Sequence, residues 1–281
     1  MSDAARIAVL GSVNVDLVVR AGRLPRPGET LHGESFTLAL GGKGANQACA
    51  AARLGADVCF IARTGTDGFG DFACDRLAAF GLGLDHLARE SAVGAGIAVI
   101  AVDSRGENAI TIVSGANARL SPADAEAARA ELSGSAVLLV QCETPFDASL
   151  AAARIVASAG GRVILDPAPA PQAGIPVDLM ALADLVTPNE TEAALLTGIP
   201  VRDRDSALAA ARALRESGAR AAVVKLGGAG LVYADADSEG FLPPFAVRVV
   251  DTVAAGDCFN AGLAVALAGG ANLLAALSFA T

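Results

Sequence analysis

The spacing of apolar residues along the chain indicates strands and helices in alternation. Short apolar runs of strand length are followed by segments whose apolar residues recur with the period of a helix. Such alternation predicts a parallel sheet whose strands are joined by crossover helices. The predicted strands are 6–10, 58–62, 137–141, 163–165, 185–186 and 221–226, and the predicted helices are 45–54, 69–80, 122–132, 148–159 and two that begin near 190 and 205.

Two further segments have a β pattern that turn residues interrupt. The first runs from about 17 to 40 and is punctuated by proline and glycine, and the second runs from 96 to 113 around a turn at 104–106. Gly and Pro between short β runs are typical of hairpins. These segments predict a small sheet apart from the main core.

Composition narrows the possible functions. Of the 281 residues, 53% are hydrophobic and 18% are charged, which is enough apolar material for a core and too little charge for a disordered chain. The 21 basic and 30 acidic residues give a net charge of −9, and the basic residues form no run. We therefore expect no nucleic-acid partner.

Cysteine and histidine usage excludes several kinds of chemistry. The five cysteines are widely spaced and form no C-x-x-C pair, which argues against a disulfide framework and a structural zinc site. The two histidines, His32 and His86, belong to no H-E-x-x-H motif and no recognisable triad. Carboxylates and backbone amides must therefore carry the chemistry.

Neither end of the chain predicts export or membrane insertion. The N-terminus lacks the charged start and long apolar run of a signal peptide, which indicates a cytoplasmic protein. Residues 261–281 carry no charge over a length that could cross a bilayer. However, Ala and Gly dominate this stretch, and the sequence at 269–272 ends one helix and begins another. We expect two buried helices here and no membrane partner.

Polar residues follow several of the predicted strands. Asn14 and Asp16 occupy alternating positions after the first strand, so their side chains point the same way. Glu143, Asp166 and Asn189 follow three later strands. Ligands bind at the carboxyl ends of strands in doubly wound sheets. These residues therefore predict a ligand site at that edge of the sheet.

A glycine-rich motif at 41–47 (GGKGANQ) precedes a helical run. It lacks the G-x-x-x-x-G-K-[ST] spacing of a P-loop. Its glycines let the backbone approach a ligand, and Lys43 and Asn46, about one helical turn apart, are placed to bind the oxygens of a polyol. The alternative is a glycine-rich helix start with a solvent-facing lysine.

A second motif at 251–260 (DTVAAGDCFN) opens the uncharged helical stretch. Small residues before a helix expose consecutive backbone amides, which together with the helix dipole bind anions such as a phosphoryl group. A carboxylate at that place, Asp257, is able to orient and deprotonate an attacking hydroxyl. The alternative is that Asp257 merely caps the helix.

Three further features each allow two interpretations. Asn189 and Glu192 stand where a strand ends and a helix begins, so they either cap that helix or form a magnesium or water-mediated phosphate shell. The turn at 227–230 either passes close to a nucleotide or simply joins two strands. Glu143 is either an acceptor for sugar hydroxyls or a cap of the next helix.

Together, these motifs resemble those of the PfkB carbohydrate kinase family. The similarity covers essentially the whole chain: 41–47 and 251–260 resemble the two signatures of the family, and 115–118, 166–169 and 187–192 resemble further family segments. The resemblance implies one domain over 1–281 with a doubly wound, Rossmann-like α/β fold. A mainly parallel sheet is flanked by helices, and a small β lid is inserted at about 15–40 and 96–113. It also implies a homodimer formed through the lid.

The activity that the resemblance implies is ATP-dependent phosphorylation of the 5-hydroxyl of D-ribose. Asp257 would be the general base, and the amides of Ala254, Ala255 and Gly256 would stabilise the transferred phosphoryl group. The same resemblance implies a set of residues that bind the sugar hydroxyls. They are Asn14, Asp16, Gly42, Lys43, Asn46, Glu143 and Asp257.

The resemblance also implies how ATP and two metal ions are held. Glu192 would bind Mg²⁺ through water, and Asp251 and Val253 would bind an activating K⁺ ion through backbone or side-chain oxygens. The implied ATP contacts are Asn189, Lys225, Gly227, Gly228, Gly230 and Gly256.

Two departures from the family pattern stand out. Lys225 occupies a position where these kinases usually have a small hydroxyl residue, so we expect an altered nucleotide contact. The helical pattern also stops at Thr281 without a polar tail, whereas family members continue with adenine contacts and further K⁺ ligands. We therefore expect a missing C-terminal segment and a half-supported K⁺ site.

Two other functions remain open at this stage. The first alternative is a family kinase for another sugar or nucleoside, such as deoxyribose. The second is a sugar-binding protein with little turnover. A NAD-dependent dehydrogenase would share the sheet, but no G-x-G-x-x-G motif opens the first helix.

Overall fold

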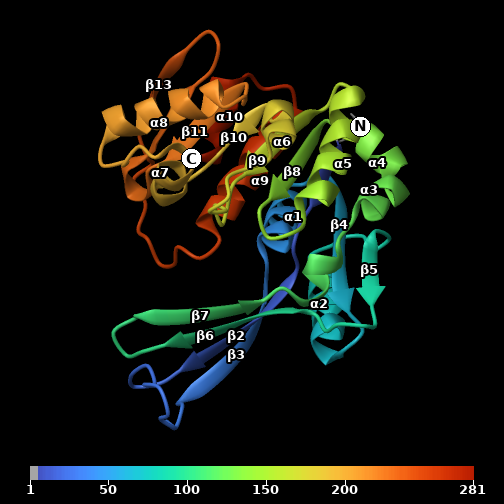
Figure 1. The fold of residues 1–281 in the computed structure, drawn as a ribbon, viewed down its shortest axis with the longest axis vertical. Helices are drawn as coiled ribbons and strands as arrows, with labels where there is room; N and C mark the ends of the chain where they lie inside the picture. Colours follow the sequence, from blue (N-terminus) through green and yellow to red (C-terminus); the bar gives the residue numbers. More distant parts are fainter. Residues whose placement is uncertain (1–5) are drawn as a thin grey trace.

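The computed structural model describes residues 6–281 and contains a nine-stranded sheet with helices on both faces (Figure 1). The strands pair in parallel from β11 to β5, and β12 and β13 continue the sheet in antiparallel pairing. In spatial order the strands are β13 (Glu239–Leu242), β12 (Leu231–Ala234), β11 (Ala221–Lys225), β10 (Leu185–Val186), β9 (Arg162–Asp166), β8 (Val137–Gln141), β1 (Arg6–Leu10), β4 (Asp57–Gly65) and β5 (Leu87–Glu90).

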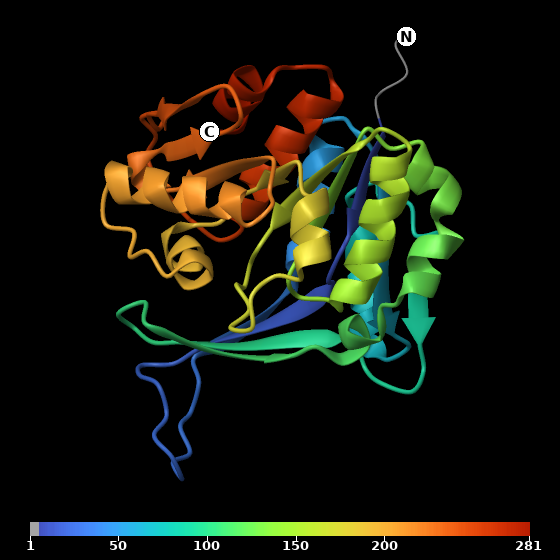
Figure 2. The same cartoon turned by 45° about the horizontal axis from the view of Figure 1, so that its top comes forward.

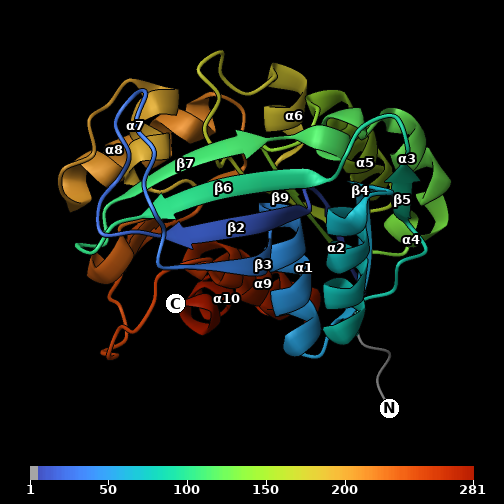
Figure 3. The ribbon, with the colours of Figure 1, turned by 90° about the horizontal axis from the view of Figure 1, so that it is seen from below.

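Two layers of helices bury the two faces of this sheet (Figure 3). One layer comprises α1 (Lys43–Arg53), α2 (Gly68–Ala79), α9 (Ala255–Ala268) and α10 (Leu273–Ala280). The other comprises α3 (Pro122–Ala127), α4 (Arg129–Ser133), α5 (Phe146–Ser158), α6 (Val177–Leu182), α7 (Glu190–Thr197) and α8 (Arg204–Glu216). The central strand β1 contributes Ile7 and Val9 to one core and Ala8 and Leu10 to the other. Burial on both faces explains why the central strands are almost continuously apolar.

The smaller sheet lies across the carboxyl ends of the main strands, as Figures 2 and 3 show. Its order is β3 (Ser35–Gly41), β2 (Asn14–Arg20), β6 (Gly96–Val102) and β7 (Asn108–Val113). Strand β2 follows β1 after only three residues, Gly11 to Val13, and β3 leads through Gly42 into α1. Both connections place lid residues directly beside the end of β1. The short 3₁₀ helix η1 (Gly115–Arg119) follows β7.

The expectation of a mainly parallel α/β fold with a small separate sheet is confirmed. The predicted helix at 122–132 is wrong in one respect, because α3 and α4 are separated at the fully buried Ala128. The bend lets both short helices contact α5. Strand β5 and helix α6, which the apolar pattern did not predict, are also present.

The uncharged stretch 261–281 forms the two expected helices, α9 and α10. Gly269 and Gly270 follow α9, and the side chain of Asn272 accepts a hydrogen bond from the amide of Ala275 at 2.9 Å, which caps α10. Within residues 6–281, no helix combines the length and apolar character that a membrane span requires.

Candidate active site

The candidate site lies where the chain changes direction across the main sheet. From β1 the chain passes through the lid and α1 to β4 on one side, whereas β8, on the other side of β1, leads on toward β11. The carboxyl ends of β1 and β8 therefore diverge around a topological switch point, which is where ligands bind in such sheets. Ser12 and Glu143, just beyond these two strands, meet there through a hydrogen bond from the Ser12 hydroxyl.

Helix α1 begins at this point with its first amide directed at Glu143. The N-cap residue, Gly42, has a φ of 88°, and a Cβ atom there would lie 2.8 Å from the backbone nitrogen of Asn14. Only glycine is accommodated in this left-handed, crowded position. The amide of Lys43 donates to Oε2 of Glu143 at 3.0 Å. Glu143 thus joins α1 to β1 and does not cap α5, whose N-cap is Pro145 without a side-chain hydrogen bond.

Asn14 is held in one orientation by Asn117 of η1. The Nδ2 atom of Asn117 donates to Oδ1 of Asn14 at 2.7 Å and to the carbonyl oxygen of Val13 at 3.1 Å. Its Oδ1 atom accepts from the amide of Val13 at 2.9 Å. These bonds leave the Nδ2 atom of Asn14 as the donor that can reach a ligand.

Asp16 lies on the lid strand β2 against glycine. A Cβ atom on Gly41 would lie 2.2 Å from the Asp16 carboxylate, so the neighbouring strand β3 has no room for a side chain there. Burial, and then the nearby charge of Glu143, raises the pKa of Asp16 to about 6. Asp16 and Glu143 are therefore two acidic groups that share one small region.

Lys43 supplies the positive charge of this region. Burial alone would lower the pKa of its ammonium group, but Asp166, Asp257, Glu143 and Glu192 outweigh that effect and raise the pKa. The Lys43 side chain is half-buried and not the solvent-facing lysine of the alternative interpretation. It therefore remains a cation among the carboxylates of the site.

Helix α9 begins on the opposite side of the site, and its first amides are available to a ligand. The N-cap residue, Ala254, has a φ of 58° and is the one non-glycine residue with positive φ in residues 6–281. The amide of Ala255 donates to the carbonyl oxygen of Thr252 at 3.2 Å. Within the described chain, the amides of Gly256 and Asp257 have no acceptor. Two free amides at a helix N-terminus form an anion site.

Asp257 points from the first turn of α9 toward α1. Its Oδ2 atom accepts a hydrogen bond from Asn46 at 3.0 Å and its Oδ1 atom accepts one from Gln47 at 3.0 Å. Neither bond is to a helix amide, so Asp257 does not act as the cap of α9. Burial raises the pKa of the buried Asp257 carboxyl group, although Lys43, Asn46 and Gln47 oppose this effect.

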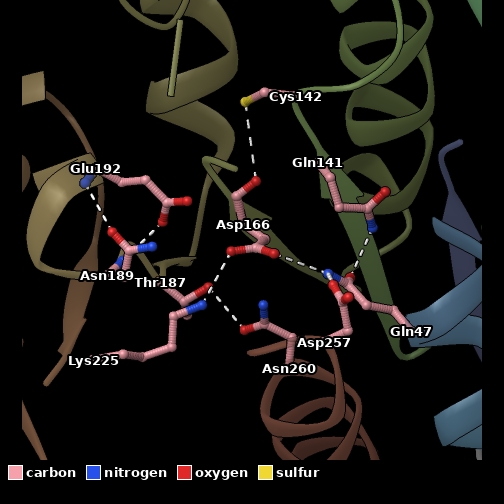
Figure 4. Close-up of polar contacts among 10 residues, drawn as sticks. All are labelled: Gln47, Gln141, Cys142, Asp166, Thr187, Asn189, Glu192, Lys225, Asp257 and Asn260. Carbon is pink, nitrogen blue, oxygen red and sulfur yellow. Dashed lines mark hydrogen bonds and ion pairs between the residues drawn. The ribbon is translucent and has the colours of Figure 1, made fainter. Parts of the chain in front are cut away.

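A buried polar network extends from Asp257 across the sheet (Figure 4). Gln47 also donates to Oδ2 of Asp166 at 3.0 Å, and Gln141 donates to Oε1 of Gln47 at 2.7 Å. On its other oxygen, Asp166 pairs with the ammonium group of Lys225 at 3.2 Å. The network therefore connects α1, β8, β9, β11 and α9.

Lys225 lies beside the start of α9. Its Nζ atom would be 3.4 Å from a Cβ atom on Gly256 and is 5.9 Å from the centre of the Phe259 ring. The ammonium group thus adds positive charge next to the free amides of α9. An anion bound there would meet a lysine as well as the helix dipole.

Asn189 and Glu192 form a capping box at the start of α7. The amide of Asn189 donates to Oε2 of Glu192 at 2.8 Å, and the amide of Glu192 donates to Oδ1 of Asn189 at 2.9 Å. The capping interpretation of these residues is confirmed. Oε1 of Glu192 has no hydrogen bond within the described residues, and Figure 4 shows the side chain extending toward the region of Asp166. That oxygen is able to hold a water ligand of Mg²⁺.

The other implied ATP and metal contacts lie on exposed backbone. The turn formed by Gly227, Gly228 and Ala229 is exposed and joins β11 to β12, with Gly230 buried behind it. Asp251 and Val253 lie on the exposed segment before α9, and the Asp251 carboxylate accepts from the amide of Val253 at 2.9 Å. In residues 6–281 no cluster of three or more His, Cys, Asp or Glu side chains could hold a metal ion.

The fold thus brings most predicted site residues together, some beside the end of β1 and one at the start of α9, which faces them. Asn14, Asp16, Glu143 and Lys43 lie by β1, and Asp257 faces them from α9. Four further residues of the site were not predicted as functional: Ser12, Gln47, Asn117 and Gln141. Asp166 was noted as a polar residue after a strand but had no assigned role. Gln47 stands in the first glycine-rich motif, which was the available signal for it.

A separate cavity of about 490 Å³ lies at the other end of the sheet. It is bordered by Arg6, Asp57, His86 and Glu131, near the amino ends of β1 and β4. None of the residues of the candidate site borders it. The chemistry described here therefore belongs to the polar residues at the carboxyl ends.

Known proteins match this chain over nearly its whole length. A family model for pfkB family carbohydrate kinases matches residues 4–281. The ribokinase of Haemophilus influenzae is 41% identical over 261 residues, which cover 93% of this chain and 85% of that protein. A deoxyribokinase of Salmonella typhi is 36% identical over 253 residues, which cover 90% of this chain and 82% of that protein.

The structural match is equally extensive. The structure of the ribokinase of Arabidopsis thaliana complexed with ribose and ATP matches with a TM-score of 0.91 and 34% identity, covering 99% of this chain and 90% of the other. The fold and the two-sided site define a phosphotransferase that acts on a hydroxylated small molecule. The chain belongs to the pfkB family of carbohydrate kinases.

Proposed function

We propose that this chain phosphorylates the 5-hydroxyl of D-ribose with ATP, giving D-ribose 5-phosphate and ADP. One observation carries the proposal: Asp257 is held by Asn46 and Gln47 at the start of α9, between the polar groups by β1 and the free amides of α9. A base between a hydroxyl site and an anion site is the arrangement that phosphoryl transfer requires.

The groups by β1 would bind the sugar. Asp16 and Glu143 are acceptors for hydroxyl protons, and the amide of Asn14, the ammonium of Lys43 and the amide of Asn46 are donors. Gly42 lets the backbone at Ser12 to Asn14 pack against the start of α1, because a Cβ atom there would meet that backbone, and this keeps the groups of the two segments together. A ring of donors and acceptors of this kind suits a polyol, in which every hydroxyl is both donor and acceptor.

Asp257 would act as the general base. It accepts the proton of the 5-hydroxyl, the hydroxyl oxygen forms a bond to the terminal phosphorus of ATP, the bond from that phosphorus to the bridging oxygen breaks, and ADP leaves. The amides of Gly256 and Asp257 and the dipole of α9 stabilise the negative charge on the transferred group. The amide of Ala255 contributes less, since it already donates to Thr252.

ATP would lie over β10 and β11, on the side of Lys225 and the 227–230 turn. Lys225 is close enough to Gly256 to contact the phosphates, and Asn189 pairs with Lys225 at the end of β11. Gly227 and Gly228 lie on the exposed turn that follows, with Gly230 buried behind it. Mg²⁺, when bound with ATP, supplies further positive charge to the phosphates. Oε1 of Glu192 would hold this ion through a water molecule.

The proposal also includes activation by potassium. Asp251 and Val253 offer oxygen atoms, but both are exposed and one Asp251 oxygen already accepts the Val253 amide. These two residues alone do not form a cage for K⁺. We therefore assign no step of the reaction to this ion, and its effect is measured by comparing turnover in KCl and NaCl.

We also propose that two chains pair through the small sheet. All six residues of its edge strand β7 are exposed, including Ile110 and Ile112 at 53% each, and Phe36 on the other edge strand is 69% exposed. Apolar edge strands favour pairing with a second copy. Light scattering on purified protein is expected to give twice the 27.9 kDa chain mass, and Ile112→Lys is expected to return it to the monomer.

The proposed compartment is the cytoplasm, where ATP is available. The five cysteines are all free thiols, and Cys49 and Cys59 are buried. Free thiols suit a reducing compartment. Fractionation of the source cells tests this location.

The test of the activity is ADP formation by the purified chain with Mg-ATP. D-ribose, deoxyribose, other sugars, nucleosides and a sugar-free control are compared in K⁺ buffer. A signal that requires ribose and exceeds that of deoxyribose supports the proposal. A larger signal with deoxyribose would assign the chain to the second candidate function, which is the activity named for a relative at 36% identity.

A further outcome separates binding from catalysis. If calorimetry shows ribose binding but no sugar in the panel yields ADP, the chain is a sugar-binding protein without turnover. If neither ribose binding nor ADP appears, the proposed substrate is wrong.

A further inference from the structure

Gln47 occupies a position between two buried carboxylates. Its side chain, fully buried on the site-facing side of α1, donates from the same nitrogen to Oδ1 of Asp257 and to Oδ2 of Asp166, each at 3.0 Å. A primary amide has two N–H donors, so one nitrogen satisfies both carboxylates (Figure 4). Asp257 and Asp166 come from different layers of the fold, and Gln47 is their common partner.

Gln141 fixes which end of the Gln47 amide faces the carboxylates. Its Nε2 atom donates to Oε1 of Gln47 at 2.7 Å. The Oε1 atom of Gln141 is buried without a partner within residues 6–281, so this orientation leaves one acceptor unsatisfied. Gly11 leaves room for the Oε1 atom of Gln141, because a Cβ atom on Gly11 would lie 2.0 Å from that oxygen. A rotated Gln141 amide would bring two carbonyl oxygens together, and the amide of Gln47 would then be free to turn.

Without the two donors of Gln47, the two carboxylates would lie near each other with no hydrogen-bond donor between them. Like charges that lie near each other in a buried site raise each other's pKa, and in the limit they share one proton. A base that holds such a shared proton cannot accept one from a substrate. The Lys225 ammonium neutralises Asp166 from the other side, at 3.2 Å.

We propose that Gln47, oriented by Gln141, is a positioning residue that separates the carboxylate of Asp257 from that of Asp166 and aims Asp257 at the substrate hydroxyl. This inference deepens the proposed function and rests on Asp257 being its base. Gln47 itself touches neither sugar nor ATP in this scheme, and it acts through Asp257.

The charged groups around Asp257 define the direction in which its pKa is expected to change when Gln47 is replaced. Lys43 of α1 faces it as a cation, Asp166 of β9 faces it as an anion, and Lys225 of β11 lies beside the preceding residue, Gly256. Asn46 and Gln47 are its hydrogen-bond donors, and both favour the ionised form. Loss of Gln47 removes one donor from Asp257 and also the donor that it gives to Asp166, so both changes raise the pKa of Asp257.

The main experiment compares wild type with Gln47→Met, which keeps the length of the side chain and removes its donors. We expect kcat at pH 7 to fall about tenfold or more, ribose affinity to change by less than about threefold, and the acidic limb of the kcat profile to move up by about one pH unit. Gln141→Leu is expected to move the limb in the same direction by a smaller amount. The matched control is Ser149→Ala, which removes a buried hydroxyl from α5, and it is expected to leave the acidic limb of the kcat profile in place.

A double variant tests the separation of the carboxylates directly. In the Gln47→Met background, Asp166→Asn removes the opposing charge and is expected to move the acidic limb back toward wild type. A merely structural role of Gln47 predicts no such rescue, because a second buried change would add to the damage. If Gln47→Met fails to fold, Gln141→Leu with and without Asp166→Asn gives the same comparison.

Carboxylate NMR keeps this inference distinct from the proposed activity. The titration of Asp257 is followed in protein labelled at the aspartate side-chain carbons, and its signal is identified by its loss in Asp257→Asn. An upward shift in Gln47→Met that Asp166→Asn reverses supports the role of Gln47, whatever sugar the chain phosphorylates. A titration that stays within about 0.3 pH unit of wild type overturns the proposal, even if ribose turnover is confirmed.

Discussion

The two helices that begin at the site, α1 and α9, start alike and are used differently. Both have an N-cap residue with positive φ, Gly42 at 88° and Ala254 at 58°, and neither N-cap has a side-chain hydrogen bond. Side chains satisfy the first amides of other helices in this chain, such as α2, α7, α8 and α10. Helices α4, α5 and α6 also lack a side-chain hydrogen bond at the N-cap, but among the α-helices of residues 6–281 the positive φ at the N-cap belongs to α1 and α9, which begin at the ligand region.

What differs is the partner of the free amides. At α1, the protein itself supplies the acceptor, because the amide of Lys43 donates to Glu143. At α9, the amides of Gly256 and Asp257 have no acceptor in residues 6–281. At the crowded start of α1 the Glu143 carboxylate already accepts the free amide, so this start suits a neutral ligand such as a sugar. The open start of α9 suits an anion that arrives with its own charge.

The strongest test of this division is Asp257→Asn, at the start of α9. The substitution keeps the shape and removes the base, so kcat is expected to fall about a thousandfold while ribose affinity changes little. Steady-state kinetics and calorimetry measure the two effects. Turnover retained within about tenfold would remove Asp257 from the role of base.

Gly42→Ala tests the crowded start of α1. The positive φ and the contact of 2.8 Å with the Asn14 nitrogen strain any side chain there, so we expect the free energy of unfolding to fall by about 3 kcal/mol. Ribose binding is expected to weaken as well. Chemical denaturation and calorimetry check both results, and Gly55→Ala, at a positive φ in open space, separates the conformational cost from the clash.

The pH dependence of ribose binding tests the sugar side alone. Asp16 has a pKa of about 6, and its ionised form is the better hydroxyl acceptor. Binding is therefore expected to be full above pH 7 and to weaken as pH falls through 6, reaching about tenfold at pH 5. Calorimetry at several pH values measures this change. Asp16→Asn is expected to flatten the profile, and a profile unchanged in that variant would assign the titration to another group.

Ala254→Gly is expected to have the smallest effect. Glycine relieves the left-handed strain at the N-cap but adds freedom to the unfolded chain, so the gain in unfolding free energy is expected to be only about 0.5 kcal/mol. Denaturation curves measure it. A large loss of stability would contradict the description of this helix start as open.

Much of the fold could be predicted because its signals are local. The apolar runs at 6–10 and 137–141 coincide with β1 and β8, since strands buried on both faces are almost continuously apolar. Asn272 marks the start of α10 through its capping bond. Strand β5 and the break at Ala128 were missed, because burial and contacts with distant elements determine them and no local pattern marks either.

The site was predictable only in part. The second motif pointed to Asp257, and the family resemblance pointed to Glu143, which stands after a strand end. The roles of Gln47 and Gln141 depend on hydrogen bonds between residues about 94 and 210 positions apart in sequence, which no spacing shows. Asp166 was visible as a polar residue after a strand, but its two partners come from β11 and α1.

The contact between Gly41 and Asp16 also constrains how this site can evolve. A Cβ atom at 41 would overlap the Asp16 carboxylate, so a larger residue at 41 requires the Asp16 side chain to move. Shortening Asp16 first would open that space, at the cost of the proposed sugar contact. The two positions are therefore epistatic, and the same substitution at 41 is damaging or tolerated according to which mutation came first. A route to a differently shaped substrate that enlarges position 41 is therefore easier when it begins with a change of Asp16 on strand β2.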